Sequence, residues 1–224
     1  MPKEHKLQII PLGGLGEVGK NMTIIRYDNQ MIMIDAGLAF PEDDLLGIDI
    51  VIPDYSFVTE NKEQLLGILL THGHEDHIGT IPYLLKDVDA PIFGTALTMG
   101  LIQARLKENN INNFKGNTVK PGQSIKLGRF KIEFIRVSHS IPDAVGLAIH
   151  TPLGAIVHTG DFKLDHTPVT GEILDIYKFA ELGQKGVLCL MSDSTNVEKP
   201  GFTMSERSVG QMFDEVFRNA KERI

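Results

Sequence analysis

Short apolar runs, bounded by turn-forming residues, predict the strands of this chain. Residues 65–70 are almost fully apolar, as expected of a strand that is buried on both faces. Asp28 with Asn29, and Pro152 with Gly154, supply tight turns between neighbouring runs. Strands are expected at residues 6–12, 22–27, 30–35, 65–70, 124–127, 131–137, 145–150, 155–158 and 186–191.

Helical patterns separate these groups of strands. Pro82 suits the first turn of a helix, and Gly183 is a typical residue at a helix end. Helices are expected at residues 81–85, 98–109 and 172–182, and from a capping-box pattern at 203–206 to the end of the chain. Because strands and helices alternate along the chain, the sequence predicts an α/β domain in which helices cover sheets.

Composition and charge limit the classes of protein that fit. A chain of 224 residues suffices for one large domain or two small ones. The single cysteine, Cys189, excludes an intramolecular disulfide framework. Residues 7–12 are too few for the apolar core of a signal peptide, and no run reaches the length of a membrane span, so we expect a cytoplasmic protein without a membrane segment.

The net charge of −7 argues against a generally basic surface for nucleic acid. The carboxylates of a metal site contribute to that charge, however, and bound cations reverse its local sign. Charge therefore leaves phosphate-bearing substrates open.

The segment from His72 to His77 places four metal-binding side chains within six residues. Zinc-type ions favour imidazole nitrogen and carboxylate oxygen. Alternate residues of an extended segment project to the same side, so His72 and His74 can reach one ion. Asp76 and His77 lie beyond the bend into a helix and are expected to bind a second ion.

Each ion needs further ligands from distant parts of the sequence. His139 follows one predicted strand and is expected to complete the first ion's protein ligands. Asp161 follows another, and its two carboxylate oxygens can bridge both ions. His150 and His158 belong to a predicted hairpin and are expected to have structural roles.

These residues, together with Gly160, resemble the motifs of the metallo-β-lactamase superfamily. Further motifs are similar to those of its β-CASP branch, and within that branch to the bacterial ribonuclease J family. The resemblance runs along essentially the whole chain. The motifs that resemble this family in particular are Pro11-Leu12-Gly13-Gly14-Leu15-Gly16-Glu17-Val18-Gly19-Lys20-Asn21, Phe40-Pro41-Glu42-Asp43 and Ser192-Asp193-Ser194-Thr195-Asn196.

The resemblance implies an αββα sandwich and a metal-dependent ribonuclease. Two Zn²⁺ ions, or Mn²⁺ in their place, would lower the pKa of a bridging water, and the resulting hydroxide would attack an RNA phosphodiester. Asp76 and Asp161 would be the catalytic carboxylates. Family members cut RNA internally and processively from a 5′ end, in RNA processing and decay. The full-length protein is expected to be a homo-oligomer.

The resemblance also suggests roles for residues outside the two metal positions. Asp35 matches the superfamily's first motif and would orient the histidines by hydrogen bonds, and Asp193 is a candidate for a similar supporting role. The Gly47 carbonyl and the Asp49 carboxylate would hold a structural Ca²⁺.

Two features of the family pattern are missing. The second ion, with Asp76, His77 and shared Asp161, is one protein ligand short, because a later histidine of the family has no match here. The RNA-binding β-CASP insert would begin at about the C-terminal end. We therefore expect residues 1–224 to be the incomplete, N-terminal portion of the metallo-β-lactamase domain of a longer enzyme, sufficient for one metal and marginal for two.

Rival interpretations remain open. Another hydrolase of the superfamily, acting on a thioester or a lactam, would use the same ions on a carbonyl carbon. A truncated chain that is inactive would fold and bind one metal or none. A dinucleotide site at Gly14, Gly16 and Gly19 is disfavoured, because a strand at residues 22–27 follows where that motif needs a helix.

Overall fold

The computed structural model describes residues 5–42, 45–169 and 171–223. Within these residues, the strands are β1 (Leu7–Gly13), β2 (Met22–Tyr27), β3 (Gln30–Ile34), β4 (Leu65–Leu69), β5 (Ile92–Gly94), β6 (Gly116–Thr118), β7 (Ser124–Leu127), β8 (Phe130–Arg136), β9 (Val145–Thr151), β10 (Gly154–His158) and β11 (Cys189–Met191). The helices are α1 (Ser56–Glu60), α2 (Glu75–Ile78), α3 (Ile81–Leu84), α4 (Ala96–Glu108), α5 (Ile176–Lys185) and α6 (Glu206–Asn219), with a 3₁₀ turn at Lys62–Gln64.

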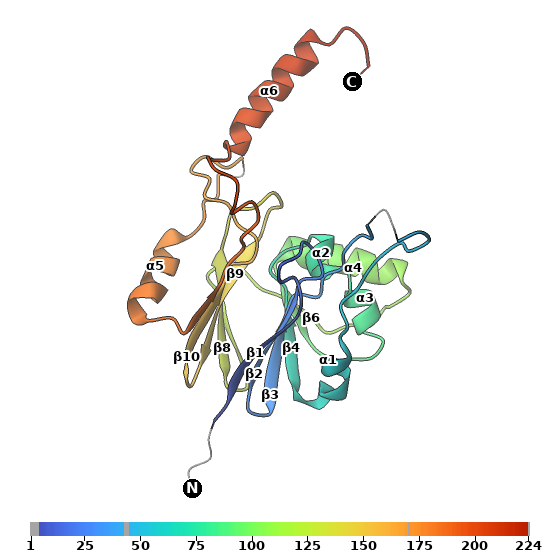
Figure 1. Cartoon of the computed structure of the whole chain (residues 1–224), viewed down its shortest axis with the longest axis vertical. Coiled ribbons are helices and arrows are strands. Elements are labelled where there is room, and N and C mark those ends of the chain that lie inside the picture. The colour runs from blue at the N-terminus through green and yellow to red at the C-terminus, as the bar shows by residue number, and fades with distance from the viewer. Residues whose placement is uncertain (1–4, 43–44, 170, 224) are drawn as a thin grey trace.

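Two sheets form the centre of the molecule (Figure 1). The first has the strand order β1-β2-β3-β4-β5-β6, antiparallel from β1 to β3 and parallel from β3 to β6. The second has the order β11-β10-β9-β8-β7 and is antiparallel except for the parallel pair of β10 and β11. In both sheets, each strand pairs with the next strand of the sequence. The two are connected by a turn, a loop or a crossover that contains a helix.

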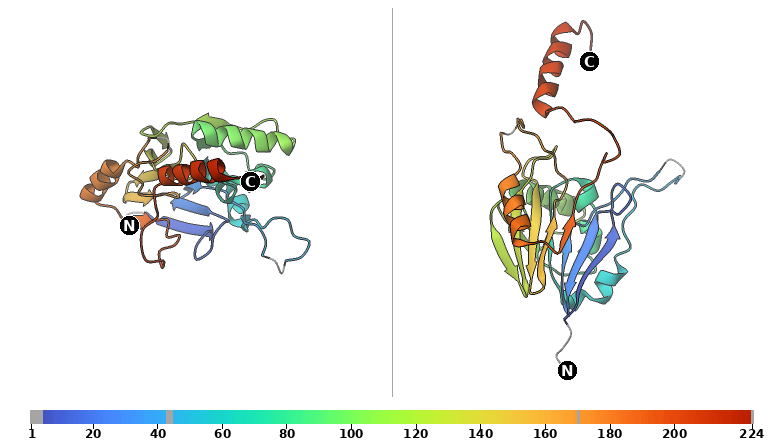
Figure 2. Two further views of the ribbon diagram at one scale, coloured as in Figure 1. Left: turned by 90° about the horizontal axis from the view of Figure 1, so that it is seen from above. Right: turned by 60° about the vertical axis from the view of Figure 1, so that its left-hand side comes forward.

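Apolar side chains fill three interfaces, and these define four layers. Between the sheets, residues such as Ile32 and Leu69 of the first sheet pack against Phe134 and Leu147 of the second. Helices α1 to α4 cover the other face of the first sheet, and α5 covers the other face of the second (Figures 1 and 2). The predicted αββα sandwich is therefore confirmed.

Helix α6 is the exception to this layering, because it projects away from the sandwich (Figure 1). Its start is fixed by Ser205, whose hydroxyl accepts a hydrogen bond from the Arg207 amide, and by Asp165, which accepts one from the Glu206 amide. The expected cap at Thr203 is therefore wrong by two residues. The helix ends at Asn219 rather than running on, and Ile224 lies outside the described residues.

Two other predictions near the C-terminus need correction. Helix α5 continues through Gly183 to Lys185 and stops where Gly186 takes a φ of +93°. The carboxylate of Asp175 caps its start, four residues later than the sequence pattern indicated. The strand expected at residues 186–191 covers only Cys189–Met191; this strand, β11, is the edge strand of its sheet, and Leu190 is 62% exposed. Among the described residues, no helix is long and apolar enough to cross a membrane.

Glu133 on β8 ties α5 to the second sheet. Its carboxylate lies 2.8 Å from the ammonium groups of Lys131 and of Lys178 on α5. Burial disfavours the charged carboxylate, but hydrogen bonds from both lysines outweigh this and lower the pKa of Glu133 to about 2.

Glu133→Gln is expected to reduce the free energy of unfolding by about 1 kcal/mol at pH 7, as for a small ion-pair network near the surface. Because the pKa in the folded state lies below the ordinary value of 4.5, this contribution is fully present above pH 4.5 and is lost as the pH falls toward 2. Urea unfolding of both proteins at pH 7 and pH 3 measures the difference. A difference that does not shrink at pH 3 would contradict the assignment.

Candidate metal centre

The ends of four strands bring the predicted ligands to one edge of the sandwich. Asp35 follows β3, and the segment His72–His77 follows the parallel neighbour β4. In the second sheet, His139 follows β8 and Asp161 follows β10. Because both sheets present these strand ends at the same edge, side chains up to 89 positions apart in sequence come into contact there, as His72 and Asp161 do.

Three histidines form the first ligand group. The Nδ1 atom of His74 lies 3.0 Å from Nε2 of His72 and 3.2 Å from Nε2 of His139. Two nitrogens bound about 2 Å from one tetrahedral zinc ion lie roughly 3.3 Å from each other. The three nitrogens therefore have the spacing that one such ion needs.

Asp76, His77 and Asp161, the residues expected to hold a second ion, make up the second ligand group. Of these, His77 and Asp161 have metal-binding spacing together with His72, and Asp76 lies beside His77. The Nε2 atom of His77 lies 3.3 Å from Oδ1 of Asp161 and 3.5 Å from Oδ2 of Asp76. The other oxygen of Asp161, Oδ2, lies 3.6 Å from Nε2 of His139 and 3.9 Å from Nε2 of His72. Asp161 thus directs one oxygen to each group, which is the arrangement that a bridging carboxylate requires.

Buried hydrogen bonds orient the imidazoles from behind. Asp35 accepts hydrogen bonds of 2.8 Å from the Thr71 amide and the Thr71 hydroxyl, and its Oδ2 lies 2.8 Å from Nδ1 of His77. The Thr71 hydroxyl also lies 3.0 Å from Nδ1 of His72. Because these contacts occupy the Nδ1 atoms, the Nε2 atoms of both rings face the ligand groups.

Asp35→Asn is expected to weaken binding of a divalent ion at His77 by about 10–100-fold, the usual effect of losing a supporting carboxylate. Asparagine tolerates the left-handed backbone that Asp35 adopts (φ +56°), so the fold should persist. Competition with a chromophoric zinc chelator measures the affinity. Asp54→Asn, on an exposed loop, is the control and should leave the affinity unchanged. Equal affinities for Asp35→Asn and the control would rule out this role.

The charge states of four ligands favour metal binding, whereas that of His77 opposes it, because an ion must displace the proton of a charged imidazole. Burial lowers the pKa of His72, to about 2, and it also lowers the pKa of His139, so both rings are neutral at pH 7 and keep a lone pair for a metal. Burial raises the pKa of the Asp76 and Asp161 carboxyl groups, but contacts with His77 outweigh it and lower both. Burial likewise opposes charge on His77, yet the carboxylates around it, Asp35 foremost, raise its pKa.

Close backbone contacts hold the Asp76–His77 segment in place. The backbone N–H of Asn21 donates to the Asp76 carbonyl oxygen (3.1 Å), and the backbone N–H of Ala36 donates to the His77 carbonyl oxygen (2.8 Å). A Cβ on Gly37 would lie 1.6 Å from the Asp76 carbonyl oxygen, so only glycine fits there.

Glu75, the remaining acidic residue of the motif, turns away from the ligand groups. Its carboxylate pairs with Arg105 of α4 at 2.7 Å. This contact ties α2, which carries Asp76 and His77, to the helical layer.

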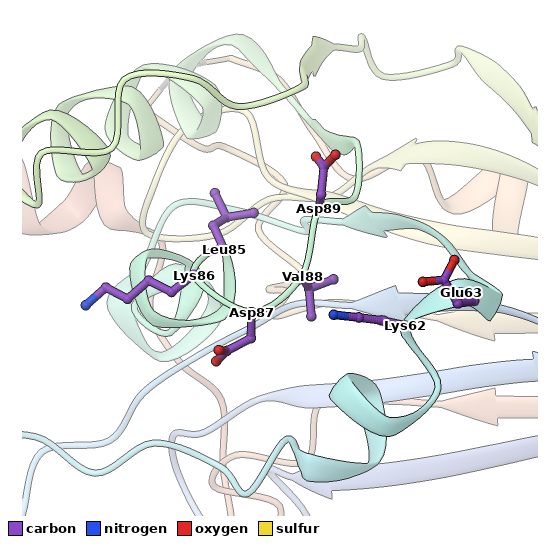
Figure 3. Close-up of a pocket in the computed structure, with 7 residues that line it drawn as sticks. All are labelled: Lys62, Glu63, Leu85, Lys86, Asp87, Val88 and Asp89. Carbon is purple, nitrogen blue, oxygen red and sulfur yellow. The ribbon is translucent and has the colours of Figure 1, made fainter.

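A cleft of about 750 Å³ opens beside the second ligand group. The loop at residues 13–19 lines one side, and residues 190–196 line another. Asp76, His77 and Asp161 form part of its wall, and its volume lies within the range of small-molecule and cofactor sites. A separate hollow of about 390 Å³, lined by Lys62, Glu63 and residues 85–89, shares no residue with the ligand groups (Figure 3).

Other predicted residues lie near the centre or away from it. Asp193 accepts hydrogen bonds from the Phe162 and Thr195 amides, so it fixes the residue that follows Asp161 without touching a ligand side chain. His158 lines the cleft, and its Nδ1 accepts a hydrogen bond from the Gly160 amide. Burial lowers the pKa of His158.

The predicted calcium site lies on an exposed turn. Gly47 has a φ of +80°, and the Asp49 side chain is exposed. The neighbouring acidic residues Asp43 and Asp44 lie outside the described residues. Calcium binding by Gly47 and Asp49 stays a prediction.

Sequence reasoning missed three residues that support the centre, namely Thr71, Asn21 and Gly37. Thr71 directly precedes the histidine motif, and that adjacency is a signal that could have identified it. Asn21 and Gly37 are distant from the motif in sequence, and their roles arise from contacts that only the folded chain creates.

A four-layer sandwich with histidine and aspartate ligands at one edge defines a metallohydrolase fold. Residues 15–187 match the metallo-beta-lactamase superfamily, and the chain therefore belongs to that superfamily. Two solved structures share this fold. One is a protein of unknown function from Enterococcus faecalis (TM-score 0.73, 19% identity, 96% of this chain and 58% of that one), and the other is Zn²⁺-bound PqqB from Methylobacterium extorquens (TM-score 0.58, 11% identity, 89% and 78%).

Among curated proteins, the chain is similar to several called ribonuclease J. It is 52% identical to that of Synechocystis sp. over 221 residues, which are 97% of this chain and 34% of the relative. It is 46% identical to that of Helicobacter pylori (97% and 32%) and 43% identical to that of Thermus thermophilus (100% and 40%). The chain thus spans about a third of the length of the relatives it matches.

Proposed function

We propose that this protein is a metal-dependent hydrolase of RNA phosphodiester bonds. The observation that carries the proposal is the placement of Asp161 between the three-histidine group and the Asp76–His77 pair, at distances that suit two ions sharing one carboxylate. The 52% identity to a protein called ribonuclease J favours RNA over other substrates of the superfamily.

Each side chain of the centre has a role in this proposal. His72, His74 and His139 would hold one ion, and Asp76 with His77 would hold the other. Asp161 would contribute one carboxylate oxygen to each ion. Bound divalent ions, zinc or manganese, would supply positive charge to the phosphoryl oxygens and lower the pKa of a bound water.

The cleft is the proposed place for the substrate. It lies beside Asp76, His77 and Asp161, and the exposed polar segment Ser192–Asn196 forms one of its walls. Substrate phosphates would be drawn to the bound cations despite the net charge of −7, because bound ions reverse the local sign of a carboxylate-rich site.

The test is a comparison of two substrates. Because the relatives are about three times as long, the longest product of the gene should be used, with 5′-monophosphorylated RNA in one assay and a thioester in the other. RNA is expected to be cleaved in a chelator-sensitive manner, and labels at the 5′ end and inside the RNA would distinguish exonuclease from endonuclease action. Cleavage of the thioester with intact RNA would instead favour the rival hydrolase.

Histidine variants provide matched controls for this assay. His139→Ala should lose RNA cleavage, because it removes a nitrogen of the three-histidine group. His166→Ala, an exposed histidine outside the ligand groups, should retain it. Equal activity of the two variants would contradict the proposal.

A further inference from the structure

The side chain of Asn21 reaches the second ligand group from the cleft side. Its Nδ2 atom lies 3.1 Å from Nε2 of His77, the nitrogen that faces Asp161, and 3.5 Å from Oδ2 of Asp76. The same Nδ2 donates a 3.0 Å hydrogen bond to the Asp76 carbonyl oxygen. One amide therefore contacts both side chains that would hold the second ion.

The glycine-rich turn before Asn21 fixes the orientation of this amide. A Cβ on Gly14 would lie 2.5 Å from Oδ1 of Asn21, so the turn packs directly on the oxygen side of the amide. Gly14 has a φ of +83°, a conformation that favours glycine. With Oδ1 against the turn, Nδ2 points to Asp76 and His77.

The main chain of Asn21 is held as firmly as its side chain. Its N–H donates to the Asp76 carbonyl oxygen at 3.1 Å, and its carbonyl oxygen accepts from the Gly37 amide at 2.8 Å. The side chain thus starts from a fixed backbone, and the metal-ligand segment and the glycine-rich turn are joined through one residue.

We propose that Asn21 is a positioning residue for the second metal, whose side-chain amide orients the Asp76 carboxylate and, in the metal-free protein, holds the His77 ring at the Nε2 atom that an ion would bind. This inference rests on the proposed function. It also implies a structural role for the glycine-rich turn at residues 13–19, because this turn packs against the Asn21 side chain and sets the direction of its amide.

Asn21→Ala is the test variant, and Asn117→Ala is its matched control. The Asn117 side chain, on β6, donates to the Ile92 and Lys115 carbonyl oxygens and belongs neither to the lining of the cleft nor to a ligand group in the described structure. Titration of the longest gene product with Zn²⁺ or Co²⁺, followed by native mass spectrometry, measures the affinity of each ion. Asn21→Ala should weaken the second ion about 10–100-fold and leave the first unchanged.

A second measurement uses the metal-free protein. The ¹⁵N resonances of the His77 ring should shift in Asn21→Ala, while those of His139 should not, because Asn21 contacts only the former ring. Wild-type affinity for the second ion, or an unchanged His77 spectrum in a folded Asn21→Ala protein, would overturn the inference. Failure of the wild-type protein to bind any ion at His72, His74 and His139 would instead overturn the proposed function.

Discussion

Asp161→Ala is expected to abolish RNA cleavage, with a fall in kcat/KM of at least about 10²-fold. Losing one contact that stabilises charge in a transition state has an effect of this size. Asp161 carries more than one such contact, because its two oxygens face His77 on one side and His139 on the other. The variant should also lose affinity for the second ion, since only Asp76 and His77 would remain there.

The assay for this prediction pairs cleavage kinetics with metal content by mass spectrometry. Asp175→Ala is the control, since Asp175 caps α5 and lies outside both ligand groups. The control should cost about 1 kcal/mol of stability, as the loss of a helix cap does, and leave RNA cleavage intact. RNA cleavage that survives in Asp161→Ala would refute the bridging role of this carboxylate.

Gly37→Ala is expected to destabilise the fold by about 3 kcal/mol or more, the upper range of overpacking. The added methyl would lie 1.6 Å from the Asp76 carbonyl oxygen and 2.8 Å from the His77 nitrogen. These are backbone atoms, so relief of the clash must move the segment that carries two metal ligands. Loss of stability and loss of the second ion should therefore occur together.

Thermal unfolding of Gly37→Ala and of a matched glycine variant measures this effect. Gly100→Ala is suitable, because Gly100 lies within α4 and a Cβ there would meet open space. Alanine in a helix interior should raise stability by about 0.5–1 kcal/mol. If Gly37→Ala unfolds at the wild-type temperature or above it, the close approach of Gly37 to Asp76 does not exist in solution.

Local patterns predicted the strands with the clearest boundaries. The range of β7 was predicted to the residue, because a polar stretch and a turn bound its alternating residues. Strands β5 and β6 and helix α1 were missed, because runs of three to five residues leave no measurable period. Gly183 misled the prediction of α5, since a single glycine is tolerated inside a helix that packs on a sheet.

In the candidate site too, local patterns identified some residues, and contacts between distant parts of the chain determine the others. The ligand motif from His72 to His77 is local, and the positions of His139 and Asp161 at strand ends made them candidates. His72, His74 and His139 have metal-binding spacing, and so do His72, His77 and Asp161, whereas Asp76 belongs to neither set. The assignment of ligands to two ions stays a prediction. The supporting roles of Asn21 and Gly37 depend on backbone contacts across 55 and 39 positions, which no local pattern encodes.

Zinc binding by the 224-residue chain, measured by native mass spectrometry with and without His139→Ala, tests the central claim most directly. One tightly bound ion per chain is expected, held by His72, His74 and His139, and it should be lost in His139→Ala and retained in His166→Ala. The contrary result would be a wild-type chain without near-stoichiometric metal, or an ion that stays bound with equal affinity when His139 is removed.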